Sequence, residues 1–276
     1  MRALATPRSI LIWSALIGVL VAVASLVGLL GAGTYEDETR NWATQAKGQD
    51  VGNLLAIAAL GTSGHYYAKG SFRASLVWVG TLLYLLYAYL VYSFALHFND
   101  LFLVYVTILG LTSYALAFAV DRLRPYEAEL PGPPVSTLAG YTLTLIGASF
   151  ALLWLSELLP AVIRREVPQS VLEAGLWVNP IHVIDLAVVL PGFILTGCMT
   201  LRGERSWMFF AGPWLVFSAL MGASIVAAMI VMAVEGSESV LPPMVMVSVV
   251  VLASVYASWR YLRRVEDPGA TTGPAG

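Results

Sequence analysis

A histidine and an aspartate lie within one helical turn of each other at the start of a long apolar run. The run reads NPIHVIDLAVVLPGF over residues 179–193, and it places His182 three residues before Asp185. Side chains three apart share one face of a helix. An imidazole can act as a general base that a carboxylate orients, and the same pair can bind a divalent metal such as zinc or relay protons. Pro191 lacks an N–H group and predicts a break later in this helix.

Three more ionisable residues stand near the ends of other apolar segments, namely Glu157, Asp50 and His97. We expect them to gather with His182 and Asp185 at one face of the molecule. Glu157 falls near the expected C-terminus of a helix, where a carboxylate opposes the helix dipole and needs a cationic or protonated partner. We therefore predict a polar site of these five residues. Within it, His182, Asp185 and Glu157 are the candidate ligands of a divalent metal, and no other cofactor is indicated.

Some of these residues also have a structural interpretation. Asn179 and Pro180 are the residues that a helix start favours, and Asp50 and Asp100 can cap the helices that follow them. Asp185 lies about 7–8 Å deeper than the helix start at 1.5 Å per residue, which is too deep for a cap. A polar network that only holds helices together stays open as an alternative to a ligand site.

The elements that must position these residues are membrane-spanning helices. Of the 276 residues, 58% are hydrophobic and 12% are charged, and the mean hydropathy is +0.77, whereas soluble domains are nearer a quarter charged. Several apolar runs reach the ~20 residues that cross the ~30 Å hydrocarbon layer as a helix. The runs are continuous rather than alternating, which favours helices over barrel strands. We predict an all-α, polytopic transmembrane helix bundle.

We expect one transmembrane domain over residues 1–264 and a disordered cytoplasmic tail over 265–276, because the tail is small, polar and rich in Pro and Gly. The domain should contain eight spans, of which the second is the shortest and most polar. The expected spans are 10–32, 51–68, 74–96, 101–120, 136–160, 180–201, 207–233 and 240–260.

The positions of Lys and Arg predict the orientation of these spans. If the N-terminus is cytoplasmic and eight spans alternate, eleven basic residues fall on the cytoplasmic side and four on the outer side. Both termini are then cytoplasmic, the location is the inner (cytoplasmic) membrane of a bacterial cell, and the five candidate residues face outward. Trp42, Trp154 and Trp177 are expected in an aromatic belt at the outer interface.

Familiar catalytic and nucleotide-binding motifs are absent from the sequence. It contains no Walker motif, GxSxG or HExxH. The single cysteine, Cys198, excludes an internal disulfide and a Cys-based metal cluster. No nucleic-acid signature is present, so the lipid bilayer is the expected partner, and the oligomeric state stays open. No inverted repeat is evident, which weakens a secondary-transporter interpretation.

Three stretches carry a resemblance to a known class. They are KGQDVGNLLAIA, KGSFRASLVWVGTLLYLLYAYLVYSFALHFNDLFLVYV and NPIHVIDLAVVLPGFILTG. They resemble bacterial multi-spanning membrane proteins of the uncharacterised class. The resemblance covers most of the chain and implies a membrane location and a bundle fold, with no activity attached.

Three functions follow from the sequence. The first is binding or transport of a metal ion, proton or small polar ligand at the outward-facing His/carboxylate site. The second is a membrane-embedded enzyme that acts on an outer-leaflet lipid or isoprenoid, with His182 as general base and Asp185 or Glu157 as its partner. The third is a structural or sensory subunit without catalysis. Whether the protein is an enzyme stays open at this point.

Overall fold

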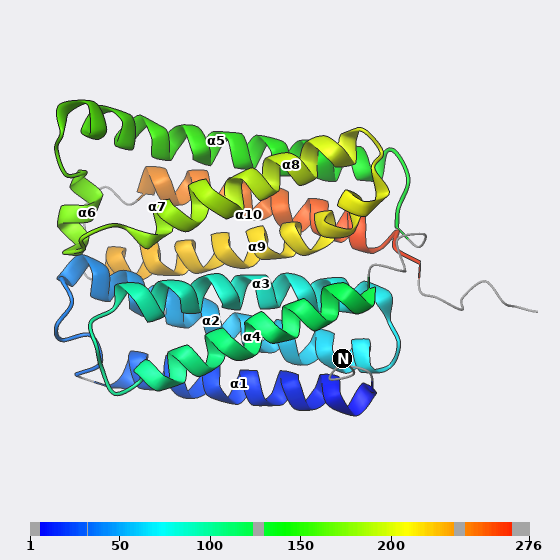
Figure 1. Ribbon diagram of the computed structural model, residues 1–276, viewed down its shortest axis with the longest axis horizontal. Coiled ribbons are helices and arrows are strands. Elements are labelled where there is room, and N and C mark those ends of the chain that lie inside the picture. Colours follow the sequence, from blue (N-terminus) through cyan, green and yellow to red (C-terminus); the bar gives the residue numbers. More distant parts are fainter. Residues whose placement is uncertain (1–5, 32, 124–129, 235–240, 267–276) are drawn as a thin grey trace, which may run out of the picture.

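The helices of the computed structural model run side by side along one long axis (Figure 1). The structure describes residues 6–31, 33–123, 130–234 and 241–266, and every regular element in these ranges is helical. The all-α prediction is thus confirmed, while the predicted tail lies outside the described residues from 267 onward. The elements are α1 (Pro7–Leu30), α2 (Arg40–Ala68), α3 (Phe72–Ala95), α4 (Phe102–Leu123), α5 (Val135–Arg164), α6 (Gln169–Ala174), α7 (Pro180–Ile184), a π-helical turn (Asp185–Val189), α8 (Leu190–Leu201), α9 (Arg205–Val234) and α10 (Leu241–Leu262).

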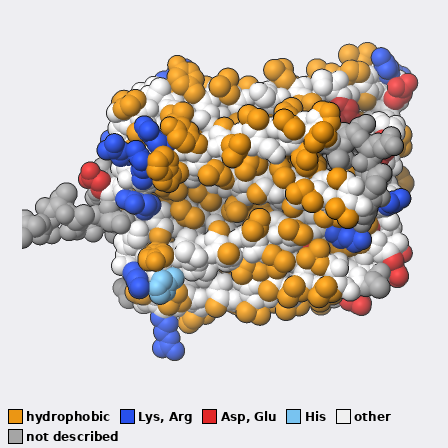
Figure 2. All heavy atoms as spheres, turned by 180° about the vertical axis from the view of Figure 1, so that it is seen from behind, with side chains coloured by type: hydrophobic (Ala, Val, Ile, Leu, Met, Phe, Trp, Pro, Cys, Tyr) orange, Lys and Arg blue, Asp and Glu red, His pale blue; other side chains and the backbone are white. Residues whose placement is uncertain are grey.

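Seven helical segments are long and apolar enough to cross a membrane: α1, α3, α4, α5, the continuous run Pro180–Leu201, α9 and α10. Exposed large apolar side chains cover the sides of the bundle. Figure 2 shows them as a broad band between two ends that carry most of the charged groups. Such a band is what lipid tails would surround. The chain is therefore a multi-pass helical membrane protein.

The two ends of the bundle carry different elements. The α6 end carries α6 and the N-terminal ends of α2 and α7, whereas the terminal end carries the start of α1 and the end of α10 (Figure 1). The N- and C-terminal parts of the described chain thus lie at the same end.

Helix α2 lies at the centre of the bundle although it is the most polar of the long helices. It packs against α1, α3 and α9, and its buried side chains run from Trp42 to Tyr67. Polar residues along its length keep it out of the set of seven apolar segments. Its status as an eighth span therefore stays a prediction.

The start of α2 differs from the expected start of the second span. The helix begins at Arg40, about ten residues before the predicted position, and the side chain of Thr39 caps it by accepting from the Trp42 N–H. The prediction that Asp50 caps this helix is therefore wrong, because Asp50 lies well inside it. The Asn179 cap is confirmed, since its side chain accepts from the Ile181 N–H at 2.9 Å.

Small residues allow α2 and α9 to approach closely. Gly48 and Gly52 on α2 face Ala228 and Ser224 on α9. A Cβ atom built on Gly48 would lie 2.1 Å from the Ala228 Cα, and one on Gly52 would lie 2.2 Å from the Ser224 Cβ. Two small residues four apart on each helix form the contact that brings helix backbones together in membranes.

Candidate functional site

A cavity of about 380 Å³ lies between α2, α3, α5, α9, α10 and the run Pro180–Leu201. Its wall is mostly apolar, and among the described residues that form it Asp185 is the one charged side chain. Amide and hydroxyl groups come from Gln45, Gln49, Ser218 and Ser224. The aromatic part of the wall consists of Trp42, Tyr87, Tyr92, Phe150, Trp154, Phe193 and Phe217. One of the five predicted site residues, Asp185, thus lines this cavity.

A widened turn of helix positions Asp185. This residue begins the π-helical turn between α7 and α8, in which the Leu190 N–H donates to the Asp185 carbonyl five residues back. Pro191 follows directly and has no N–H to donate, and its ring conflicts with a carbonyl four residues back, so regular α-helical geometry is not available here. The predicted break takes the form of this π turn, a feature that is frequent at functional sites.

The Asp185 carboxyl is held by neutral hydrogen-bond donors. The indole N–H of Trp154 on α5 donates to the Asp185 Oδ2 at 2.8 Å. Tyr87 on α3 is the other hydrogen-bonding neighbour of this carboxyl. The residue is 9% exposed, so these two donors take the place of water. They fix the carboxyl in the cavity wall without neutralising a negative charge.

His182 and Glu157 lie beside Asp185 but outside the cavity wall. The His182 Nε2 is 4.0 Å from the Glu157 Oε2, is buried, and has no hydrogen-bond partner. The ring of His182 packs on Trp154 with the centroids 4.7 Å apart. The other oxygen of Glu157 accepts from the Ser170 N–H at 3.1 Å, in the first turn of α6. The partner that Glu157 needs is therefore supplied mainly by a backbone N–H rather than by a cation.

Asp50 lies in a separate buried network. Its Oδ2 accepts from the Tyr35 hydroxyl at 2.7 Å, and its Oδ1 accepts from the Tyr92 hydroxyl at 3.0 Å. Burial and the neighbouring Asp50 carboxylate raise the pKa of Tyr35 far above its ordinary value, so its phenol stays protonated and continues to donate. Gly28 on α1 packs directly on this pair, because a Cβ there would lie 2.3 Å from the Asp50 Oδ2. The network ties α1, α2 and α3 together.

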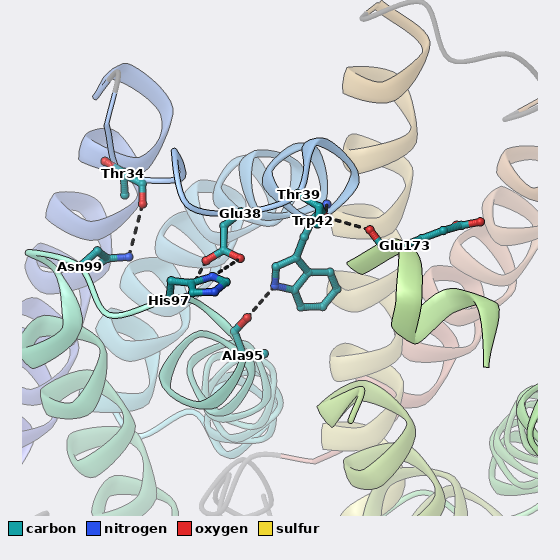
Figure 3. Close-up of polar contacts among 8 residues, drawn as sticks. All are labelled: Thr34, Glu38, Thr39, Trp42, Ala95, His97, Asn99 and Glu173. Atoms are coloured by element: carbon teal, nitrogen blue, oxygen red, sulfur yellow. Dashed lines mark hydrogen bonds and ion pairs between the residues drawn. The ribbon is translucent and has the colours of Figure 1, made fainter. Parts of the chain in front are cut away.

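His97 belongs to the loop contacts at the α6 end, which Figure 3 shows. Its backbone N–H donates to the Glu38 Oε1 at 2.6 Å, and its Nδ1 lies 3.1 Å from the Glu38 Oε2. The side chain of His97 is 57% exposed, while that of Glu38 is 2% exposed. In the same region the Trp42 indole donates to the Ala95 carbonyl at 2.7 Å. His97 thus helps to join the α3–α4 loop to the start of α2.

The five predicted residues therefore do not form one site. Asp185 lines the cavity, His182 and Glu157 pack behind it, and Asp50 and His97 lie in two other places. The described residues contain no group of three or more His, Cys, Asp or Glu side chains that could hold a metal ion. The suggested metal ligands His182, Asp185 and Glu157 do not make such a group either.

The sequence interpretation missed several residues of the cavity wall. Trp154 was expected in an interfacial belt, yet its indole N–H donates to Asp185. The available signal was its position three residues before Glu157, which places both side chains on one face of the helix. Gln49 was also missed, because the second span was expected to begin after it. Its Nε2 donates to the Tyr84 hydroxyl at 2.6 Å, and its Oε1 accepts from the Ser224 hydroxyl at 3.3 Å. Trp177 is fully exposed, which suits the predicted belt.

Comparison with protein-family models, with curated proteins and with solved structures finds no match to this chain.

Proposed function

We propose that this protein binds an amphipathic molecule in the cavity beside Asp185 and takes it up from the outer side of the membrane. In this proposal α2 is an eighth span, both termini are cytoplasmic, and the α6 end faces outward. The membrane is the cytoplasmic membrane of a bacterium. The proposed ligand is thus amphipathic, rather than the metal ion or small polar molecule that the residue types alone suggested.

The distribution of basic residues supports this orientation, because cytoplasmic ends of membrane proteins carry an excess of Lys and Arg. Figure 2 shows most of the basic side chains at the end from which the chain terminus leaves. The basic residues described at the α6 end are Arg40, Lys47, Arg164 and Arg165. Those described at the terminal end are Arg8, Lys69, Arg73, Arg122, Arg202, Arg205, Arg260, Arg263 and Arg264.

The observation that carries the proposal is the composition of the cavity wall. A volume of about 380 Å³ falls in the range of pockets that hold small ligands. Apolar and aromatic side chains would cover the hydrocarbon part of the ligand, and a few convergent polar groups would fix its head. Trp42 and Gln45 on α2 and Ile181 on α7 place part of the wall near the α6 end. Entry from that end needs no passage through the whole bundle.

A membrane-embedded enzyme is the second candidate, and one observation favours it. The His182 Nε2 is buried without a hydrogen-bond partner, as a general base waiting for a substrate proton would be. However, His182 is not part of the cavity wall, so a substrate bound there meets Asp185 rather than the imidazole. Binding therefore fits the geometry better than catalysis. The structural alternative is best supported for Glu157, whose carboxylate caps α6.

The test compares two tryptophan substitutions on adjacent residues of α10. Val250 lines the cavity, whereas Val249 is 60% exposed and lies outside the wall. The probe is N-phenyl-1-naphthylamine, an uncharged dye that fluoresces in apolar surroundings. We expect saturable binding to the wild type and to Val249→Trp, and at least about ten-fold weaker binding to Val250→Trp.

Equal binding by the two variants would refute the proposal, because the dye would then report only lipid or detergent. Thermal unfolding of both proteins provides the folding control. If Val250→Trp does not fold, Ile225→Trp on the α9 wall replaces it in the same comparison. A change in dye binding on His182→Ala, with Val250→Trp silent, would favour the second candidate.

A further inference from the structure

We propose that the head of the bound amphiphile carries a positive charge, as in a lipophilic amine or quaternary ammonium compound. This inference rests on the proposed cavity function and narrows the ligand to one charge class. It is supported by the charged and aromatic groups of the cavity wall and by the charged residues at the α6 end.

Asp185 has no cationic partner among the described residues of the cavity wall. The described wall residues include no Lys, Arg or His. The donors to the carboxyl, Trp154 and Tyr87, are both neutral. His182, one turn earlier, has its Nε2 beside Glu157 at 4.0 Å. A buried carboxylate is costly unless a positive group pairs with it, and a cationic ligand would supply that group.

The same wall is rich in aromatic side chains. Seven aromatic side chains line the cavity together with one carboxyl. Aromatic faces attract desolvated cations through their ring quadrupoles, and recognition of quaternary ammonium groups commonly uses this property. An anionic head would meet the Asp185 carboxylate and the negative faces of these rings. The wall therefore discriminates by charge as well as by polarity.

The α6 end, through which the ligand would enter, carries a surplus of negative charge. Acidic residues described at this end outnumber the four basic ones. They are Glu36, Asp37, Glu38, Asp100, Glu157, Glu166 and Glu173. A surplus of negative charge raises the local concentration of cations and lowers that of anions. The entrance and the wall thus favour the same sign of ligand charge.

The test uses three probes of the same four-phenyl shape and different charge: tetraphenylphosphonium, tetraphenylmethane and tetraphenylborate. Binding is measured as the shift in thermal unfolding of the purified protein in lipid nanodiscs. We expect the cation to bind most tightly and the anion to give no specific shift. Asp185→Asn keeps an acceptor for the Trp154 N–H but removes the charge. It should weaken binding of the cation by about ten-fold or more and leave binding of the neutral probe within about two-fold.

This experiment distinguishes failure of the charge assignment from failure of the proposed cavity function. If the neutral probe and the cation bind equally, in the wild type and in Asp185→Asn, the charge assignment is wrong while the cavity function stands. A preference for tetraphenylborate would overturn the charge assignment as well. The cavity function itself fails if no probe gives a shift in thermal unfolding that is lost in Val250→Trp and kept in Val249→Trp.

Discussion

The close approach of α2 and α9 makes Gly48→Ala a sharp test of the packing. A Cβ at this position would lie 2.1 Å from the Ala228 Cα and 2.4 Å from its Cβ, whereas carbon atoms in contact are about 3.5–4.0 Å apart. The two helices would have to separate locally by about 1.5 Å, and the obstructing atoms include backbone, which cannot rotate away. Overpacking of this kind costs about 1–3 kcal/mol, and we expect the upper part of that range here.

Gly61→Ala on the same helix is the matched control. No other atom lies within 4 Å of a Cβ built on Gly61, so this variant gains the helix propensity of Ala, about 1 kcal/mol, without a clash. Because Gly48→Ala gains the same term, the difference between the two variants isolates the steric cost. At about 2–4 °C per kcal/mol, Gly48→Ala should unfold roughly 5–10 °C below Gly61→Ala in the same detergent or nanodisc. Unfolding of the two variants within about 2 °C of each other would refute the close packing of α2 on α9.

Three further substitutions test the other polar contacts by thermal unfolding and proteolysis. Tyr35→Phe removes a 2.7 Å bond to the buried Asp50 and should cost about 1–3 kcal/mol, while Tyr114→Phe, at an exposed position, should not. Because the pKa of Tyr35 is raised in the fold, its contribution is fully present below pH 10 and declines above it. The advantage of the wild type over Tyr35→Phe should therefore shrink as the pH rises beyond about 10; a constant advantage would contradict this. Glu38→Ala leaves the His97 N–H without its acceptor and should cost more than His97→Ala, which removes only the contact of the 57% exposed imidazole and keeps the backbone bond; equal losses would show that the backbone contact is unimportant. Glu157→Gln weakens the cap on α6 by about 0.3–1 kcal/mol, so proteolysis between residues 165 and 179 should be faster, and an unchanged rate would exclude the capping role.

Helix class and most helix positions were predictable, because long apolar runs have few alternatives in a membrane protein. The start of α2 was not, for a physical reason. Its first ten residues, from Arg40 to Gln49, are polar enough to read as a loop, yet neighbouring helices bury several of them. Tertiary packing, rather than local hydrophobicity, makes this segment helical. The displacement moved Asp50 from the predicted end of a helix to its interior.

The candidate site was predictable only in part, because residue type reports chemistry but not direction. His182 and Asp185 are three residues apart and were expected to share one helix face. The residues of this segment that line the cavity are spaced by four, namely Ile181, Asp185 and Val189, so His182 lies to one side of the cavity wall. The cavity itself depends on seven aromatic side chains from five helices. No single stretch of sequence encodes such a wall.

The polar character of α2 bears on how the chain enters the bilayer during synthesis. An Asp near the middle of an isolated helix opposes insertion by the translocon by about 2.5–3.5 kcal/mol, and α2 adds Lys47, Gln49 and Asn53 to Asp50. Its neighbours α1 and α3 flank it in sequence, but α9 is made more than 130 residues later. Until α9 arrives, the surface of α2 that packs on Ala228 and Ser224 lacks these partners. If α2 is the proposed eighth span, its insertion depends on helices that follow it, and truncation of the chain before α9 should leave α2 accessible to labelling from the water phase.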